Sequence, residues 1–235
     1  MRYAGLAVLL SLIALPGAWG QTARTLSEVD PGVTVAIDLT RAVRFDFATG
    51  REKTDELSSA KRKISGGVSF RIKPLRKTLL DLIDTDREHR FVLGGQYEYS
   101  RADEAGITHI EHKIMLDGTF RNTLPAKFLL THRSRFELRW LDGEFHWRYR
   151  DRLMFERPLK AGTIRFTPFG AAEAVWDRRY TKFTIFKFTG GVTFPLIRRS
   201  TLDILYERQH CVVCSDPHTN IIGVSLNLYL RRKKK

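Results

Sequence analysis

The chain has 235 residues, of which 40 are Lys or Arg and 26 are Asp or Glu, and its formal net charge is +14 at pH 7. Its length is that of one domain, and no stretch after the N-terminal leader has the roughly 18 consecutive apolar residues that a spanning helix needs. The basic charge does not by itself indicate a nucleic-acid partner, because the arginines alternate along predicted strands and do not cluster on a helix.

The first residues have the pattern of a secretory signal peptide. Met1-Arg2 gives a positive start, Ala4–Leu15 is mostly apolar, and Ala18-Trp19-Gly20 fits a small-x-small cleavage site. A membrane anchor is the alternative, but the apolar run is short and no stop-transfer pattern follows. The predicted organisation is a signal peptide at 1–20, a periplasmic N-terminal segment at 21–32, a β-barrel at 33–230 and a basic tail at 231–235.

Ten segments of the remaining chain alternate apolar and polar residues, which predicts β-strands with two unlike faces. They are Val33–Phe47, Ile64–Lys73, Phe91–Ser100, Thr108–Arg121, Lys127–Leu141, Trp147–Arg157, Thr163–Trp176, Phe183–Phe194, Thr201–Gln209 and Asn220–Leu230. Residues 74–90 give no clear prediction. Short connections that contain Pro alternate with longer polar ones, as in up-and-down barrels with an even strand number and both termini in the periplasm. The predicted fold class is all-β: a single up-and-down antiparallel transmembrane β-barrel of about ten strands, within a range of about 8–12.

The faces of these strands distinguish a membrane barrel from a soluble one. In residues 131–140, THRSRFELRW, Phe136, Leu138 and Trp140 alternate with charged residues. A membrane barrel turns such an apolar face to lipid and the charged face to its lumen, where Arg and Glu side chains can pair. The ladder predicted to face the lumen comprises Arg133, Arg135, Glu137, Arg139, Arg148, Arg150, Arg152, Glu156, Arg165 and Glu173.

The placement of the aromatic residues near strand ends supports a membrane barrel. Amphipathic rings collect at the two membrane interfaces of such barrels. We expect Trp140, Trp147 and Trp176 at the extracellular rim, and Phe120, Phe128, Phe155, Phe166 and Phe194 at the opposite rim. Several polar residues conflict with this register because they fall on the predicted lipid face: Arg41, His112, His132, Asp151 and Arg208.

The two cysteines, Cys211 and Cys214, form one CxxC motif. This spacing is compatible with redox or metal chemistry in a cytosolic protein. A single pair is a weak zinc signal, and in an exported protein a local disulfide is the better interpretation.

Several of these segments together resemble a known family. RSRFELRW, WRYRDRL, PFGAAEAVWDRR, DILYERQ and NIIGVSLNLYL are similar to the domain-of-unknown-function family 2490, over roughly Val33 to Leu230. The resemblance implies an exported bacterial outer-membrane β-barrel with no assigned activity, and it implies no catalytic residue. One feature departs from such barrels, which commonly end on an aromatic residue: here Leu228-Tyr229-Leu230 is followed by five basic residues.

The first functional hypothesis is a small non-enzymatic outer-membrane barrel. It is either a structural protein whose Arg–Glu pairs fill the lumen, or a narrow pore that favours anions because its wall is basic. This hypothesis includes no cofactor, no metal and no nucleic acid. Its partners are outer-membrane lipid and small anions, and the sequence does not define an oligomeric state.

Two alternatives remain open. One is an envelope lipid-modifying enzyme that uses His132 and Ser134, since a Ser–His pair is the minimum for acyl transfer and resembles the His-x-Ser arrangement of outer-membrane lipid A deacylases. No acidic residue is evident on the same face at the same height to orient the histidine. The other is a soluble periplasmic β-barrel that binds an anionic ligand, which requires the apolar faces to point inward. A metal site at His109, Glu111 and His112 is disfavoured because the two histidines point to opposite faces of one strand.

Overall fold

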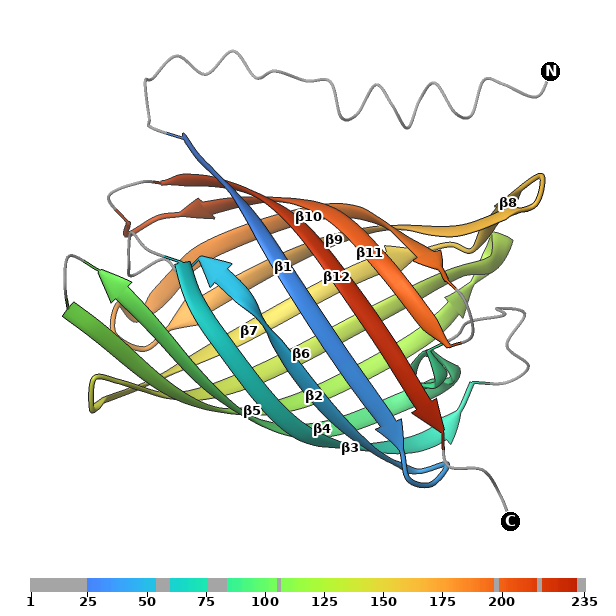
Figure 1. Cartoon of the computed structure of the whole chain (residues 1–235), viewed down its shortest axis with the longest axis horizontal. Helices are drawn as coiled ribbons and strands as arrows, with labels where there is room; N and C mark the ends of the chain where they lie inside the picture. Colours follow the sequence, from blue (N-terminus) through green and yellow to red (C-terminus); the bar gives the residue numbers. More distant parts are fainter. Residues whose placement is uncertain are drawn as a thin grey trace.

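The computed structural model describes residues 25–53, 60–75, 84–104, 107–196, 199–214 and 217–231. Eleven long strands in these ranges close into one barrel (Figure 1). They are β1 (Thr25–Asp38), β2 (Val43–Lys53), β3 (Ala60–Pro74), β4 (His89–Glu104), β5 (Ile107–Leu124), β6 (Phe128–Leu141), β7 (Glu144–Glu156), β9 (Ile164–Asp177), β10 (Lys182–Pro195), β11 (Ser200–Cys211) and β12 (His218–Arg231). The predicted all-β barrel of transmembrane type is therefore confirmed. The predicted leader and residues 232–235 of the predicted tail lie outside the described residues.

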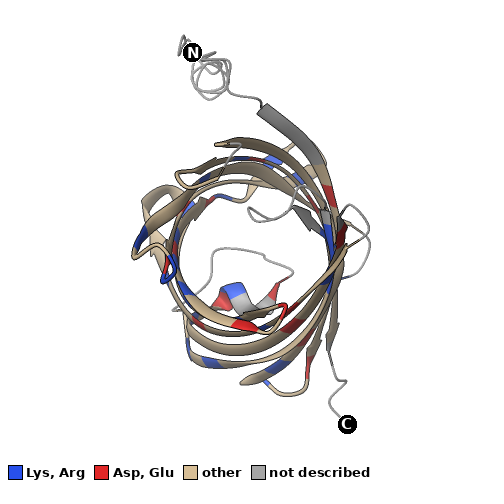
Figure 2. Cartoon of the chain, turned by 90° about the vertical axis from the view of Figure 1, so that its left-hand side faces the viewer, with Lys and Arg blue, Asp and Glu red and all other residues tan. Residues whose placement is uncertain are grey.

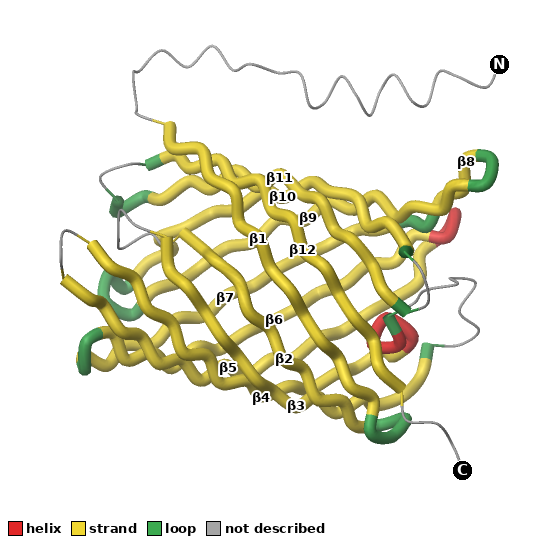
Figure 3. The backbone as a smooth tube through the Cα atoms, in the orientation of Figure 1, coloured by secondary structure: helices red, strands yellow, loops and turns green. Residues whose placement is uncertain are grey.

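The smaller elements belong to the connections between consecutive barrel strands (Figure 3). A three-residue strand, β8 (Leu159–Ala161), pairs only with the start of β9. Two short 3-10 helices are η1 (Thr85–Glu88), before β4, and η2 (Pro125–Lys127), between β5 and β6. No helix in the described ranges is long and apolar enough to cross a membrane.

The strand count exceeds ten because the segment predicted as one strand, Val33–Phe47, is two strands. Its middle forms a turn in which the backbone N–H groups of Leu39 and Thr40 donate to the carbonyl of Val43. The Thr40 hydroxyl accepts hydrogen bonds from the N–H groups of Ala42 and Val43 at 3.1 and 2.9 Å. Threonine side chains close turns in this way. Arg41 is therefore an exposed turn residue and not a charge facing lipid in mid-strand.

The barrel closes through a parallel pair, which differs from the predicted topology. Each strand is antiparallel to its sequence neighbour in the barrel, but β1 and β12 pair in parallel, from Thr25 beside His218 to Asp38 beside Arg231. An odd number of alternating strands requires one such pair. The start of β1 and the end of β12 consequently lie at opposite ends of the barrel (Figure 1). The expectation that both ends lie on one side is wrong, and Thr25–Gly32, which falls within the predicted N-terminal segment, belongs to a barrel strand.

The interior of the barrel is polar and its exterior is apolar. Among the described residues, 26 buried side chains are polar or charged and ten are hydrophobic, whereas 31 large hydrophobic side chains are exposed. Along β6, for example, Glu137 and Arg139 are 2% exposed, while Phe128 on the opposite face is 36% exposed. Soluble proteins rarely expose apolar surface on this scale, and the arrangement is that of a barrel whose solvent is lipid. The soluble alternative requires apolar faces that point inward, whereas in the structure these faces point outward.

Candidate functional site

The predicted charge ladder lies on the inner wall formed by β6, β7 and β9. On the lumen side, the register between β6 and β7 places Arg133 beside Arg152 and Arg135 beside Arg150. The same period of two that sends Phe136 and Trp147 outward sends these charges inward. Of the ten predicted ladder residues, Arg165 does not join the others. It is an exposed residue opposite Lys160 in the β8–β9 hairpin, which extends beyond the barrel.

Two predicted carboxylates neutralise part of this wall. Glu137 accepts a hydrogen bond from Arg150 at 2.9 Å. Glu173 accepts two from the same guanidinium, at 2.9 and 2.5 Å, and lies 3.7 Å from Arg133. A guanidinium that binds two carboxylates uses several of its donors at once, so Arg150 connects β6, β7 and β9 across the wall.

Glu111 of β5 is a further acceptor that the sequence pattern did not assign to the ladder. Its buried carboxylate accepts a hydrogen bond from Lys61 at 2.8 Å and another from Arg139, and Lys113 lies 4.0 Å away. Lys113 itself binds Glu98 at 2.7 Å. The period of two already places Glu111 and Lys113 on the polar face of the segment Thr108–Arg121, but it does not tell which charges on other strands they meet.

The two ends of the lumen differ. We call the end formed by the β4–β5, β6–β7 and β9–β10 connections the tryptophan mouth, and the opposite end the η1 mouth. Figure 2 looks in from the tryptophan mouth and shows η1 within the outline of the barrel. Arg87 of η1 binds the lumen-facing Glu156 at 2.8 Å, and Asp84 accepts a hydrogen bond from Arg44 at 2.7 Å. These contacts hold the segment before β4 against the inner wall.

Two arginines counteract the effect of burial on the Asp84 carboxyl. Burial alone would raise the pKa of this carboxyl, but the neighbouring Arg44 and Arg87 hold the pKa below its ordinary value. Arg44 also binds Asp38 at 2.9 Å, and Asp38 accepts a second hydrogen bond from Arg71. The η1 mouth therefore has its own network of paired charges.

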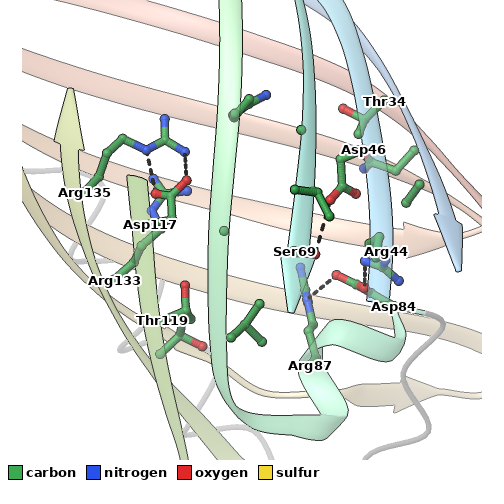
Figure 4. A pocket seen from close by; sticks show the side chains of 18 of the residues that line it. Thr34, Arg44, Asp46, Ser69, Asp84, Arg87, Asp117, Thr119, Arg133 and Arg135 are labelled. Atoms are coloured by element: carbon green, nitrogen blue, oxygen red, sulfur yellow. Dashed lines mark hydrogen bonds and ion pairs between the residues drawn. The ribbon is translucent and has the colours of Figure 1, made fainter. Parts of the chain in front are cut away.

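A cavity of about 390 Å³ lies in the lumen (Figure 4). Residues from β1 to β7, from β11 and β12, and from η1 line it. Its charged lining comprises six arginines and four aspartates: Arg44, Arg87, Arg121, Arg133, Arg135, Arg152, Asp46, Asp84, Asp117 and Asp203. Arg135 is held by Asp117 through hydrogen bonds of 2.7 and 3.0 Å, which Figure 4 shows. The lining carries more positive than negative charge.

The predicted rim aromatics lie near the two ends of the strands. Trp147 packs against Trp176 with tilted rings and centroids 4.8 Å apart, and Trp140 packs against Phe145 in the same way at 5.2 Å, both at the tryptophan mouth. At the η1 mouth, Arg157 lies over the ring of Phe128 and Arg90 lies over the ring of Phe120. The other residues predicted for that rim, Phe155, Phe166 and Phe194, lie on strand segments that end at the η1 mouth.

The outer face carries a polar cluster that contains the predicted His132 and Ser134. Asp151 lies directly opposite Ser134 on β7. Its carboxylate accepts hydrogen bonds from Ser134 at 3.1 Å, from Tyr149 at 2.9 Å and from His132 Nε2 at 2.9 Å. The acidic partner that was not evident in the sequence is therefore Asp151, which the alternation marks only as a residue in conflict with the register.

Other polar residues on the predicted lipid face differ in their surroundings. His112 is paired with the hydroxyl of Tyr97, 2.7 Å away. His109 binds Asp142 in the β6–β7 turn at 2.7 Å, so His109, Glu111 and His112 have separate partners. Within the described ranges, no group of three His, Cys, Asp or Glu residues could hold a metal ion. Arg208 is exposed on β11 opposite Phe188.

Cys211 and Cys214 form a disulfide with a Cα–Cα distance of 5.5 Å. Cys211 is the last residue of β11, so the bridge closes a four-residue loop at the tryptophan mouth. It packs with the buried side chains of Val175 and Ile185. The bond occupies both sulfurs, which leaves neither available as a thiolate ligand.

Comparison with known proteins identifies one family and one similar structure. The family model described as "Protein of unknown function (DUF2490)" matches residues 84–213. No curated protein sequence matches the chain. Among solved structures, LpxR from Salmonella typhimurium aligns with a TM-score of 0.46 and 6% sequence identity, over 80% of this chain and 83% of that one.

Proposed function

The chain belongs to the DUF2490 family of proteins of unknown function, and we propose that it is a non-enzymatic bacterial outer-membrane β-barrel whose lumen passes small anions in preference to cations. The observation that carries the proposal is the cavity in the lumen, with six arginines and four aspartates in its lining. A basic constriction attracts anions and repels cations. The apolar exterior and the N-terminal leader pattern support a location in the outer membrane.

The paired charges account for the narrowness of such a lumen. Ion pairs such as Arg150–Glu137 at 2.9 Å and Lys113–Glu98 at 2.7 Å fill space in the lumen near the middle of their strands. The contacts of η1 reduce the opening at the other end. An anion that crosses would therefore exchange its hydration for arginine donors along the wall. In this proposal the tryptophan mouth faces the exterior and the η1 mouth faces the periplasm.

Ion selectivity in planar bilayers tests this function. Under a KCl gradient, the reversal potential should indicate a higher permeability for chloride than for potassium. Arg135→Glu should reduce that preference, because it replaces a positive charge on the cavity wall by a negative one beside Asp117. We expect roughly a tenfold change in the permeability ratio, which corresponds to about 1.4 kcal/mol of electrostatic free energy. Absence of conductance, or a cation preference in the parent protein, would argue against the proposal.

A second candidate function is hydrolysis of lipid esters at the outer-face cluster. The observation in its favour is that Asp151 binds both His132 and Ser134. Ionisable groups on a lipid-facing surface are costly and often functional. Attack by the Ser134 hydroxyl on an acyl ester would give an acyl-enzyme and release the alcohol, with the proton passing to Asp151 or His132, and water would then release the acid. The hydroxyl donates to Asp151 in the structure, so Asp151 is the nearest base.

Hydrolysis of p-nitrophenyl decanoate in detergent micelles tests the second candidate. If the cluster is catalytic, Ser134→Ala should lower kcat/KM by at least about a hundredfold, because it removes the nucleophile. Ser65→Ala is a matched control, since that hydroxyl faces the lumen and accepts a hydrogen bond from Gln96 at 2.8 Å. A parent protein that is no faster than protein-free micelles, or equal losses in the two variants, would exclude this function.

A further inference from the structure

One part of the cavity wall holds like charges with few acceptors. Arg133 of β6 and Arg152 of β7 are direct cross-strand neighbours. Like charges placed opposite each other in a sheet repel. Arg133 lies 3.7 Å from Glu173, but that carboxylate already binds Arg150 at 2.5 and 2.9 Å. Within the part of the chain that the structure describes, the buried Nε of Arg152 has no hydrogen-bond partner.

A neutral donor lies beside this pair. Thr131 is 7% exposed, and its buried hydroxyl has no hydrogen-bond partner among the described residues. It is two residues before Arg133 on the same face of β6, and it lies opposite Arg121 of β5 in the sheet register. All four residues line the cavity. Buried polar groups without partners carry a free-energy cost, and a ligand or ion that supplies acceptors can offset it.

Three other arginines of the cavity already have close carboxylate acceptors. Arg135 binds Asp117 through two nitrogens, and Arg44 binds both Asp38 and Asp84. Arg87 binds Glu156 at 2.8 Å. The excess positive charge is therefore concentrated where Arg133 and Arg152 meet, with Arg121 nearby on β5. In Figure 4, dashed lines join Arg135 to Asp117, and none joins Arg133 to another of the labelled residues.

We propose that Arg133, Arg152 and Thr131 form a binding site for a phosphate group in the lumen, with Arg121 adding positive charge. Guanidinium groups present forked donors that match phosphate oxygens, and a hydroxyl adds a further donor. A divalent anion neutralises two adjacent arginines better than chloride does. The cavity of about 390 Å³ is larger than a single phosphate ion, so it also has room for a small phosphate monoester. This site rests on the proposed function, because both assume a lumen that accepts anions. Phosphate binding does not require that the lumen conducts ions.

Thermal unfolding of the full chain in detergent micelles, followed by tryptophan fluorescence, tests the site. Inorganic phosphate at 10 mM should raise the Tm of the parent by several degrees, relative to NaCl of equal ionic strength, because a ligand that binds only the folded state stabilises it. Arg152→Gln should weaken the apparent phosphate affinity by about tenfold or more. Lys160→Gln removes one positive charge from the exposed β8–β9 hairpin and should leave the phosphate response unchanged. Glycerol 3-phosphate in place of phosphate distinguishes a monoester site from one that takes only the free ion.

Two further variants separate binding at this site from a general effect of charge on stability. Without phosphate, Arg152→Gln should unfold at the same temperature as the parent or higher, because it relieves repulsion from Arg133. Thr131→Val keeps the side-chain shape and should weaken phosphate binding several-fold, so it tests the site even if an arginine variant does not fold. A parent Tm that does not respond to phosphate, or an equal response in Arg152→Gln, would overturn the proposal. A phosphate response in a barrel that does not conduct would leave this site standing and reject the pore.

Discussion

Replacing Glu111 by glutamine is expected to lower the free energy of unfolding by about 3–5 kcal/mol, the usual cost of removing one partner from a buried ion pair. Glu111 is 1% exposed and lies among Lys61, Arg139 and Lys113. Glutamine keeps the shape but removes the charge, so these cations would face one another without their shared counter-ion. Equilibrium unfolding in detergent or lipid vesicles measures the loss.

A surface control separates loss of pairing from loss of a carboxylate. Glu144 is exposed beside the β6–β7 turn, and Glu144→Gln should change stability by less than about 0.5 kcal/mol. Adding Arg139→Met to Glu111→Gln should recover part of the loss, because it removes one of the unbalanced charges. If Glu111→Gln were as harmless as Glu144→Gln, the inward-facing network would not contribute to stability. Glu173→Gln should also lower the free energy of unfolding. Glu137→Gln should lower it less, because its partner Arg150 still binds Glu173.

The second large effect is expected on the opposite face of the barrel. Phe136 points outward near the middle of β6, and its ring centroid is 4.9 Å from that of Trp147. Phe136→Arg should cost about 2–4 kcal/mol in a lipid bilayer, the range for arginine at the midplane of a membrane barrel. Unfolding by denaturant in vesicles measures this cost.

Phe145→Arg is the matched control for depth. Phe145 also loses one aromatic contact, with Trp140 at 5.2 Å, but it lies beside the β6–β7 turn at the tryptophan mouth. An arginine near the interface costs only about 0–1 kcal/mol, apart from the lost ring contact. Equal costs at the two positions would mean that lipid does not surround the middle of β6.

The sequence predicts the fold class well because a barrel strand carries its signal locally. Alternation along Lys127–Leu141 is enough to assign Phe136 outward and Glu137 inward, and every other strand is interpreted in the same way. Partners across strands are not local. Asp151 meets His132 and Ser134 because the β6–β7 register puts it opposite Ser134, and alternation cannot supply that register. The sequence of its own strand shows Asp151 only as a charged residue on an otherwise apolar face.

The topology is harder to predict because one short turn interrupts an unbroken alternation. Val33 to Phe47 keeps apolar residues at odd positions on both sides of the turn that Thr40 closes. The pattern therefore continues while the chain reverses. This one turn changes the strand count to odd and with it the direction of the closing pair.

The parallel pair also bears on the order in which the barrel assembles. Each of the other neighbouring strand pairs joins segments that are consecutive barrel strands in the sequence, so these pairs can form as hairpins or short meanders. The β1–β12 contact joins Thr25 to His218, and no tight turn can connect parallel strands. The entropy of closing so long a loop delays this contact, and the slanted hydrogen bonds of a parallel pair stabilise it slightly less per residue. Folding is therefore a sequence of fast local steps followed by one slow closure, and the β1–β12 seam is where an incompletely folded chain would present two unpaired strand edges.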